Sequence, residues 1–531
     1  MSEIQLYDTV LRDGAQREGI SFSVVDELHI AQKLDELGIH YIEGGWPGSN
    51  PKDTEYFHKA RNLSLSNSTL VAFGSTRRPD TKAETDANLK ALVEAETSVV
   101  TIVGKSSESQ VVQVLETTLE ENCRMIADSV RFLKAKGLTV FFDAEHFFDG
   151  FKANPAYALR VLKIAAEAGA DCLVLCDTNG GTLPGEVVNA IEAVKKSTGA
   201  SLGIHAHNDS ELAVANTLAA VRAGVNQIQG TVNGYGERCG NTNLCSVIPT
   251  LKLKMSIDCV TDEQLAKLTE VSHYISEVAN LAPDPFLPYV GSSAFSHKGG
   301  LHAAAMAKWE SSYQHLDPAK VGNKLRVVIS ELAGRRNIIH KAKELGFDLS
   351  KSKDGAQKLL EQVKLQESRG FQYEGAEASF ELLLHRAAPD YEPPFELVDF
   401  MVVVERRRRP AARKSPGEML SEAAVKVKVG IEVRHTVSEG NGPVNALDLA
   451  LRKALLQFYP SLAQVKLVDY KVRILEESVG TESQVRVLIE SSDGINEWHT
   501  VGSSTDIIEA SWLALADGLE YWLTKQNNKT D

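Results

Sequence analysis

The first 260 residues alternate regularly between short apolar segments and longer amphipathic ones, and this alternation constrains the fold more than any other feature. The amphipathic segments, such as 24–38 and 154–169, have the spacing of helices, and several end in glycine. Eight apolar segments have the length of buried strands, at 4–10, 40–45, 70–76, 98–104, 139–145, 171–178, 202–208 and 227–234. Eight strand–helix units within about 250 residues are typical of a TIM (β/α)8 barrel. No Gly-x-Gly-x-x-Gly motif follows the first strand, which argues against a dinucleotide-binding sheet.

The alternation stops after Cys259, and two further regions follow. Helical patterns, interrupted by the proline-rich segment 282–291, continue to about residue 388. From Phe395 the chain is rich in strand patterns, with helical patterns at 442–458 and 506–523. We therefore expect a catalytic barrel over residues 1–260, helical linker subdomains over 261–390 and an α+β domain over 391–531.

Composition limits the classes of partner. A chain of 531 residues has room for two or three domains, and its 43% of hydrophobic residues supplies their cores. The formal net charge is −14 and no basic stripe dominates, so we expect no nucleic-acid partner. We expect no membrane association because no apolar stretch approaches the length of a membrane span. The N-terminal segment has no signal-peptide pattern, so we expect a cytoplasmic protein whose six cysteines are free thiols.

Polar residues stand at the carboxyl end of each predicted strand, which is where TIM barrels carry their active sites. Arg12, Asp13 and Gln16 follow the first strand, and Glu43 ends the second. The later strands add Thr76 with Arg77, Lys105, Asp143 with Glu145, Asp177 with Thr178, and His205 with His207. The sequence therefore predicts that these side chains meet at one end of the barrel.

The segment HAHND, at 205–209, predicts a metal site. Residues two apart on a strand point to the same side, so His205 and His207 can bind one divalent ion. Closure of the barrel places the eighth strand next to the first and the seventh, so Asp13 and Asn241 can join them. This ligand set fits zinc, manganese or magnesium and leaves positions open for substrate oxygens. Asn241 could instead hold a loop by hydrogen bonds.

Three segments together resemble the DRE-TIM metallolyase superfamily, and in particular its Claisen-condensing branch of 2-isopropylmalate, homocitrate and citramalate synthases. They are DTVLRDGAQ at 8–16, IHAHND at 204–209 and NGYGERCGNTNL at 233–244. The likeness extends to HKGGLHAAA at 297–305 and to the C-terminal third. It implies that the methyl carbon of acetyl-CoA attacks the ketone of a 2-oxo acid, after which the thioester is hydrolysed.

This reaction needs a group that stabilises the developing alkoxide. Arg12, next to the ligand Asp13, is placed for that role, and an ion pair of Arg12 with Glu43 is compatible with it. The resemblance implies that Thr178 holds the substrate carboxylate through its hydroxyl. Gln16 and Glu43 are expected to contribute to the substrate pocket.

The methyl group of acetyl-CoA needs a base. Glu145 ends a strongly apolar strand, where partial desolvation strengthens a carboxylate base, and it matches the family's glutamate on the fifth strand. An ion pair with Arg12 or Arg78 is the alternative role for Glu145. By resemblance, His302 is the acid or base that reaches the neighbouring subunit's site, and Tyr313 is a weaker candidate of the same kind. We interpret Cys239 as a packed thiol, because GERCGN follows the synthase pattern rather than the lyase pattern.

The C-terminal segments 440–455 and 501–521 resemble the regulatory domain of 2-isopropylmalate synthases, which pairs and binds an end-product amino acid. The resemblance implies a homodimer with a shared active site and feedback control.

The choice of 2-oxo acid depends on few residues. Phe73, Ile102 and Phe141 are expected in the pocket wall, where bulky groups favour the methyl of pyruvate, although one methylene discriminates by only about 1–3 kcal/mol. Segments 41–53 and 141–155 resemble the citramalate-forming group of the family, which implies pyruvate and acetyl-CoA as substrates and isoleucine as feedback ligand. The alternatives are 2-oxoisovalerate with leucine control, then homocitrate synthesis, a carbon–carbon lyase on the same barrel, or an amino-acid sensor without turnover.

Overall fold

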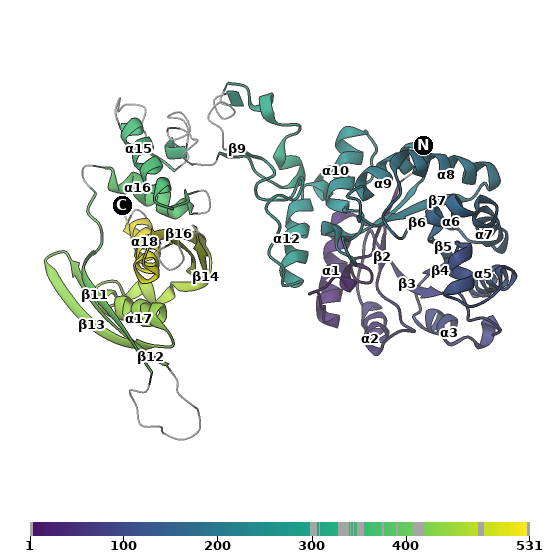
Figure 1. Cartoon of the computed structure of the whole chain (residues 1–531), viewed down its shortest axis with the longest axis horizontal. Coiled ribbons are helices and arrows are strands. Elements are labelled where there is room, and N and C mark those ends of the chain that lie inside the picture. The colour runs from purple at the N-terminus through teal and green to yellow at the C-terminus, as the bar shows by residue number, and fades with distance from the viewer. Residues whose placement is uncertain are drawn as a thin grey trace, which may run out of the picture. The chain divides into compact units, whose positions relative to one another are not determined.

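The computed structural model in Figure 1 divides into two compact units, residues 1–295 with 316–325, and residues 296–315 with 326–531. The structure describes residues 4–297, 305–306, 308–327, 339, 341–343, 345–347, 355–373, 376–388, 391–406, 419–475 and 483–527. The first unit extends to Phe295, past residue 260 where the sequence predicts the end of the barrel domain. Both units contain a hydrophobic core of their own.

Eight parallel strands form the closed barrel that the sequence predicts, in the order in which they occur along the chain. Strand β1 pairs with β2 on one side and with β8 on the other, where Tyr7 lies opposite Gln229. The strands are β1 (Gln5–Asp8), β2 (Tyr41–Glu43), β3 (Thr69–Ser75), β4 (Val99–Lys105), β5 (Thr139–Glu145), β6 (Cys172–Asp177), β7 (Ser201–Ala206) and β8 (Gln227–Gly230). Because all eight strands are parallel, their carboxyl ends lie at the same end of the barrel.

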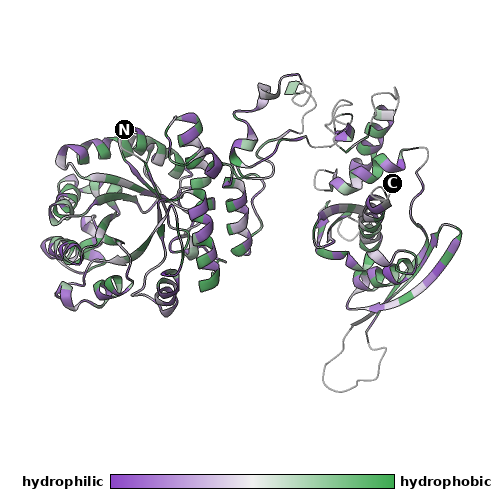
Figure 2. Ribbon diagram, turned by 180° about the vertical axis from the view of Figure 1, so that it is seen from behind, coloured by the Kyte–Doolittle hydropathy of each residue, from purple (hydrophilic) through white to green (hydrophobic). Residues whose placement is uncertain are grey.

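Helices surround the barrel, and their ends carry the signals read from the sequence (Figure 1). Helix α1 begins with a capping box formed by Ser23 and Asp26, and it ends at Gly38, whose φ of 86° suits glycine. The helices of this ring are α1 (Val24–Leu37), α2 (Pro51–Ala60), α3 (Ala87–Glu94), α4 (Glu108–Gln113), α5 (Leu119–Ala135), α6 (Phe147–Ala153), α7 (Pro155–Ala168), α8 (Pro184–Ser197), α9 (Ala213–Arg222) and α10 (Leu244–Lys254). Figure 2 shows that they carry both hydrophilic and hydrophobic residues, as expected of helices that cover a sheet on one side.

The barrel has two apolar layers. Residues such as Ile102 and Phe142 point outward and pack against the helices in the large core of the first unit. Residues of alternate parity, such as Tyr7 and Phe141, fill the interior in a second, smaller cluster. Alternation along the strands therefore decides which side chains can take part in a site inside the barrel.

The first unit continues with α11 (Asp262–Leu265) and α12 (Leu268–Val278), and α12 packs on α1. Short elements follow along the chain. Strand β9 (Ser296–His297), its partner β10 (Arg326–Val327) and the 3₁₀ helix η4 (Glu310–Tyr313) belong to the second unit, and the 3₁₀ helix η5 (Pro318–Val321) belongs to the first. No helix among the described residues is long and apolar enough to cross a membrane.

The second unit contains the α+β domain predicted at the C-terminus. Two three-stranded antiparallel sheets, each followed by a helix, share one core. The first repeat is β11 (Glu396–Arg406), β12 (Met419–Val429), β13 (Glu432–Gly440) and α17 (Pro443–Leu455). The second is β14 (Lys466–Ile474), β15 (Val485–Ser492), β16 (Glu497–Ser504) and α18 (Ile507–Asn527).

Two preceding helices, α15 (Gly355–Ser368) and α16 (Glu377–Arg386), pack against the second repeat. Phe380 and Leu383 of α16 share a cluster with Val501 of β16. Arg386 reinforces this contact by ion pairs with Asp517 and Glu520 of α18. The end of the helical linker region is therefore joined to the regulatory-type fold by a common core.

Candidate metal centre

Asp13, His205 and His207 converge at the carboxyl end of the barrel. Asp13 follows β1 and precedes the 3₁₀ helix η1 (Gly14–Gln16), His205 lies in β7, and His207 follows that strand. Oδ2 of Asp13 lies 3.3 Å from Nε2 of His205 and 3.9 Å from Nε2 of His207. All three side chains are buried, and one ligand atom from each lies within 4.8 Å of the others. The predicted Asp/His/His set is thus assembled.

Backbone hydrogen bonds fix the loop that carries Asp13. The carbonyl of Thr9 accepts from the amides of Arg12 and Gly14, which turns the chain sharply after β1. The buried carboxylate of Asp8 accepts from the amides of Val10 and Val232, so it links this turn to the loop after β8. The sequence DTVLRDG folds locally into a rigid support for its metal ligand.

Asn241 lies beside His207 of this cluster. It forms an isolated β-bridge with His207, and its Nδ2 donates to the carbonyl of Tyr235. Its Oδ1 is buried and has no hydrogen-bond partner among the described residues, and the same holds for Nδ1 of His207. A buried carbonyl oxygen without a partner is costly unless something binds it, so the donor set fits a divalent cation.

The protonation states of Asp13 and His207 suit a cation, whereas the hydrogen bond to Asp13 raises the pKa of His205 despite its burial. Burial, followed by the neighbouring His205, lowers the pKa of His207 to about 4, so this imidazole is neutral at pH 7. Burial alone would raise the pKa of Asp13, but Arg12 and His205 hold it well below its usual range. The site therefore offers a carboxylate and a neutral imidazole, the forms in which these groups bind metals.

Arg12 lies beside the cluster in a fixed orientation. Its Nε donates to Oε2 of Glu43 at 2.9 Å, and its Nη1 lies 3.3 Å from Oδ2 of Asp13. Its guanidinium carbon lies 4.0 Å from the centre of the Phe73 ring. Glu43 is fully buried and also accepts from the hydroxyl of Tyr7. The Arg12–Glu43 ion pair considered in the sequence analysis is present, and a direct substrate contact by Glu43 stays a prediction.

Two further polar residues lie in the barrel interior next to His205. No role was assigned to either of them from the sequence. Oδ1 of Asp143 in β5 accepts from Nε2 of Gln229 in β8, and Oε1 of Gln229 lies 2.9 Å from Nδ1 of His205. Burial, and then the charge of Glu43, raise the pKa of Asp143 to about 7. The sequence could have revealed Asp143, because it lies two residues before Glu145 on the same strand and so points to the same side. Gln229 could be found only from the β7–β8 register, which places it opposite His205.

Glu145 and Thr178 stand at the ends of β5 and β6, at the same end of the barrel. Glu145 forms an ion pair with Lys105 of β4, and not with Arg12 or Arg78, the two partners considered from the sequence. The register of β4 and β5 explains the pairing, because it sets Lys105 directly opposite Glu145. Oγ1 of Thr178 accepts from the amide of His146, which ties the loop after β6 to the loop after β5.

The other predicted site residues are more scattered. Gln16 is exposed at the end of η1. Tyr313 lies in η4 of the second unit and is half exposed. His302 lies outside the described residues. Cys239 is exposed, so its interpretation as a packed thiol is wrong; the tight loop around Gly236 and Gly240 turns its side chain toward solvent.

The expected pocket wall is only partly right. Phe73 packs under the guanidinium of Arg12, but Ile102 points away from the barrel interior into the core shared with the helices. The reason is strand parity, since Thr101 faces inward and contacts the hydroxyl of Tyr7. Phe141 is an interior residue and lies two positions before Asp143 on β5, one layer below the polar groups.

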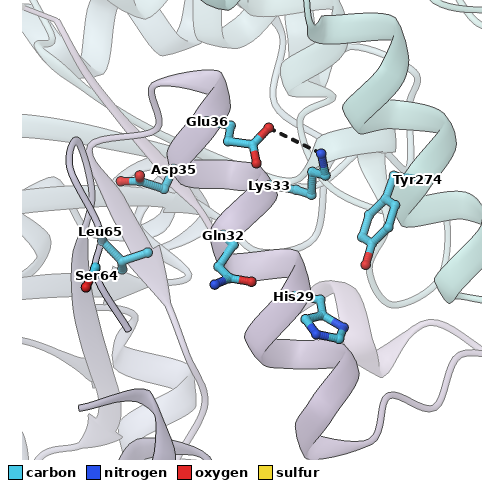
Figure 3. A pocket seen from close by; sticks show the side chains of 8 residues that line it. All are labelled: His29, Gln32, Lys33, Asp35, Glu36, Ser64, Leu65 and Tyr274. Atoms are coloured by element: carbon cyan, nitrogen blue, oxygen red, sulfur yellow. Dashed lines mark hydrogen bonds and ion pairs between the residues drawn. The ribbon is translucent and has the colours of Figure 1, made fainter. Parts of the chain in front are cut away.

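A separate pocket lies on the outer layer of the first unit, between α1 and α12 (Figure 3). His29, Gln32 and Lys33 of α1 and Tyr274 of α12 are among the residues that line it. The ammonium group of Lys33 is paired with Glu36 and Glu270. Residues 64 and 65 on its rim precede β3, at the end of the barrel opposite the metal cluster, so this pocket is no part of the candidate site.

Three family models match successive parts of the chain. The HMGL-like model matches residues 3–275, which span the barrel. The homocitrate synthase post-HMGL domain-like model matches residues 289–370, and the LeuA allosteric (dimerisation) domain model matches residues 374–523. Their order is that of the barrel, linker region and α+β domain described above.

Several relatives match this chain over nearly its whole length. An (R)-citramalate synthase of Geobacter sulfurreducens is 54% identical over 525 residues, which cover 99% of this chain and 98% of the relative. An (R)-citramalate synthase of Aquifex aeolicus is 51% identical over 529 residues, 99% of each chain. A 2-isopropylmalate synthase of Methanocaldococcus jannaschii is 30% identical over 528 residues, covering 98% of this chain and 95% of the relative.

Proposed function

The chain belongs to the HMGL-like family and, within it, to the (R)-citramalate synthases, and from this premise we propose how its site carries out the reaction. Acetyl-CoA, pyruvate and water are converted to (R)-citramalate and CoA. The observation that carries the proposal is the buried cluster of Asp13, His205 and His207 at the carboxyl end of the barrel. The relatives with this name are 54% and 51% identical, against 30% for the 2-isopropylmalate synthase, which supports pyruvate over 2-oxoisovalerate.

Asp13, His205 and His207 would hold a zinc, manganese or magnesium ion, with Oδ1 of Asn241 as a further ligand. When bound, such a cation supplies Lewis-acid polarisation of the ketone and a template for the oxygens of pyruvate. The hydroxyl of Thr178 accepts from the amide of His146, so its own hydrogen remains available for the substrate carboxylate.

Arg12 stabilises the negative charge that develops on the ketone oxygen. A guanidinium has five N–H donors, and its contacts with Glu43 and Asp13 leave donors for the substrate. Glu43 fixes one edge of the guanidinium and Phe73 fixes its plane, so little reorganisation is needed when the charge appears. Gln16 lines the pocket at the mouth.

Glu145 acts as the base. It takes a proton from the methyl group of acetyl-CoA, and the electron pair of that C–H bond forms the new bond to the ketone carbon of pyruvate. The ion pair with Lys105 holds the carboxylate of Glu145 at the end of β5. As the new bond forms, the π pair of the ketone moves to its oxygen, which takes up a proton and becomes the hydroxyl of the product. A water molecule then adds to the thioester carbon, its oxygen stays in the new carboxylate, and CoA leaves as the thiol with a proton from water. His302, as acid or base, and Tyr313 are proposed to act in the site of the neighbouring subunit.

The LeuA-type domain gives the protein the region for pairing and for binding an effector. We propose a homodimer with a shared active site and isoleucine as its feedback ligand, in isoleucine biosynthesis. The cytoplasmic location stays a prediction.

Replacement of Asp13 tests the site. Asp13→Asn should lose most bound Mn²⁺ and nearly all formation of (R)-citramalate, because a neutral amide is a much weaker ligand than a carboxylate. Mn²⁺ per chain and product are measured on the same dialysed sample. Asp209→Asn is the matched control, since Asp209 lies two residues after His207 but pairs with Arg238. If Asp13→Asn binds Mn²⁺ and turns over substrate as well as the unaltered protein, the proposal is refuted.

A further inference from the structure

We propose that Gln229 is a positioning residue which fixes the tautomer and ring orientation of His205, and that Asp143 fixes the amide of Gln229 in turn. The three side chains form a continuous relay across the barrel interior, from β5 through β8 to β7. This inference rests on the proposed metal site, because it concerns how one ligand of that site is held. The hydrogen bonds of the relay reach His205 but do not reach Asp13 or His207.

The relay lies where water cannot replace its members. Asp143, Gln229 and His205 are 3%, 1% and 5% exposed. His205 and Gln229 are neighbours across the β7–β8 ladder, so the backbone itself holds their side chains on the same side of the sheet. An unpaired polar group here would cost the full penalty of its lost hydrogen bond.

When Asp143 is ionised, donor and acceptor chemistry allows one polarity along the relay. A carboxylate only accepts, so Asp143 must face the amide nitrogen of Gln229, 3.1 Å away. That orientation turns the amide oxygen toward His205, where it lies 2.9 Å from Nδ1. An amide oxygen also only accepts, so Nδ1 carries the proton. In the neutral ring, the form that binds a cation, the lone pair is then on Nε2, the atom that points at Asp13.

The two histidines of the cluster are therefore held differently. His205 has a dedicated partner for its second nitrogen, whereas Nδ1 of His207 is buried with no hydrogen-bond partner among the described residues. A hydrogen bond to the second nitrogen of a ligating imidazole orients the ring and raises its basicity, and its loss typically weakens metal affinity by about 10- to 100-fold. We assign His205 as the preorganised imidazole of the pair.

The test uses Gln229→Met with Gln227→Met as its matched control. Both glutamines lie on β8, point into the barrel and are at most 1% exposed. Gln227 touches the relay only through a long contact, 3.5 Å between its Oε1 and Nε2 of Gln229, and only Gln229 contacts His205. The affinity for Mn²⁺ is measured from the electron paramagnetic resonance signal of the free ion. We expect about 10- to 100-fold weaker binding in Gln229→Met and less than about 3-fold in Gln227→Met.

A second pair of variants tests the polarity of one bond: Gln229→Glu adds a negative charge, and the double variant with Asp143→Asn restores the original net charge. In Gln229→Glu the new carboxylate still accepts from His205 but faces Asp143, so two carboxylates meet. In the double variant Gln229→Glu with Asp143→Asn, the amide of the new asparagine donates to the new carboxylate and the relay is complete again. The double variant should bind Mn²⁺ at least about fivefold more tightly than Gln229→Glu alone.

The outcomes separate the relay from the metal site. If the unaltered protein binds no Mn²⁺, the proposed metal site itself fails. If it binds Mn²⁺ and Gln229→Met binds equally well, the relay is refuted while the site stands. Equal losses in Gln229→Met and Gln227→Met would also refute it, since they would reflect general disturbance of the interior. Should Gln229→Met not fold, the comparison of the single and double polar variants decides.

Discussion

At the scale of residues, Arg12 connects the parts of the site. Its guanidinium contacts a proposed metal ligand, Asp13, a fully buried carboxylate, Glu43, and an aromatic face, Phe73. A lysine carries the same charge but is a single point of contact, and it cannot reproduce the planar arrangement. The site therefore depends on the planar shape of the Arg12 guanidinium as well as on its charge.

Replacement of Arg12 by lysine should therefore lower kcat by about 100- to 1,000-fold, the usual cost of a lost oxyanion donor. Mn²⁺ affinity should change little, because Asp13 and both histidines remain. Steady-state kinetics and metal titration are run together on Arg12→Lys. Arg17→Lys is the control, since Arg17 belongs to the same loop but lies over the ring of Tyr235. A kcat within threefold of the unaltered protein would contradict the role given to Arg12.

Sequence reasoning succeeded for residues whose spacing implies a shared face. His205 and His207, two apart on one strand, and Asp13 at the end of the first strand were predicted together and lie together. Gln229 was not predicted, because its partner lies 24 positions earlier and only the register of two strands brings them into contact. We predicted that Ile102 faces the pocket, but it points outward into the core shared with the helices. A shift of one residue along a strand moves a side chain to the opposite face of the sheet.

At the scale of elements, helices α1 and α2 are joined by an ion pair whose carboxylate is almost completely buried. Glu27 of α1 is 1% exposed and pairs through Oε1 with Lys52 of α2. Its Oε2 and the nearby hydroxyl of Tyr56 are buried and have no hydrogen-bond partner among the described residues. Burial raises the pKa of Glu27 from 4.5 to about 7, despite the neighbouring Lys52.

The raised pKa makes this contact sensitive to pH. The folded state holds the Glu27 proton more tightly than the unfolded state, so its contribution to stability is full below about pH 4.5 and is lost as pH rises through about 7. Glu27→Gln stays neutral, so the urea midpoint of the variant relative to the unaltered protein should be higher at pH 8 than at pH 5. Glu55→Gln, which breaks an exposed pair with Lys59, serves as control. An equal difference at both pH values would contradict this account.

The elements themselves were well predicted. Each of the eight strands lies within its predicted segment or overlaps most of it, because a parallel barrel buries its strands and makes them continuously apolar. Helix ends at Gly38 and Gly169 follow from the left-handed conformation that glycine adopts at little cost. Contacts between residues far apart in the sequence, such as Lys105 with Glu145, depend on the register of the strands and could not be predicted.

At the scale of the whole molecule, the candidate site and the LeuA-type domain lie in different units. The metal cluster belongs to the first unit, and the LeuA-type domain belongs to the second. The sequence predicted both folds, because the strand–helix alternation and the later strand-rich pattern are local signals. It predicted the identity of the 2-oxo acid through resemblance, since the two pocket residues it placed correctly inside the barrel, Phe73 and Phe141, do not by themselves select a substrate.

The most direct test of the account is release of free CoA from acetyl-CoA by the full chain, first stripped of metal by a chelator and then supplied with Mn²⁺. Pyruvate, 2-oxoisovalerate and 2-oxoglutarate are compared side by side, with chiral analysis of the product. We predict turnover with pyruvate to (R)-citramalate only after Mn²⁺ is restored, and at least tenfold less with the larger oxo acids. Full activity in the stripped protein, or preference for a larger oxo acid, would contradict the account.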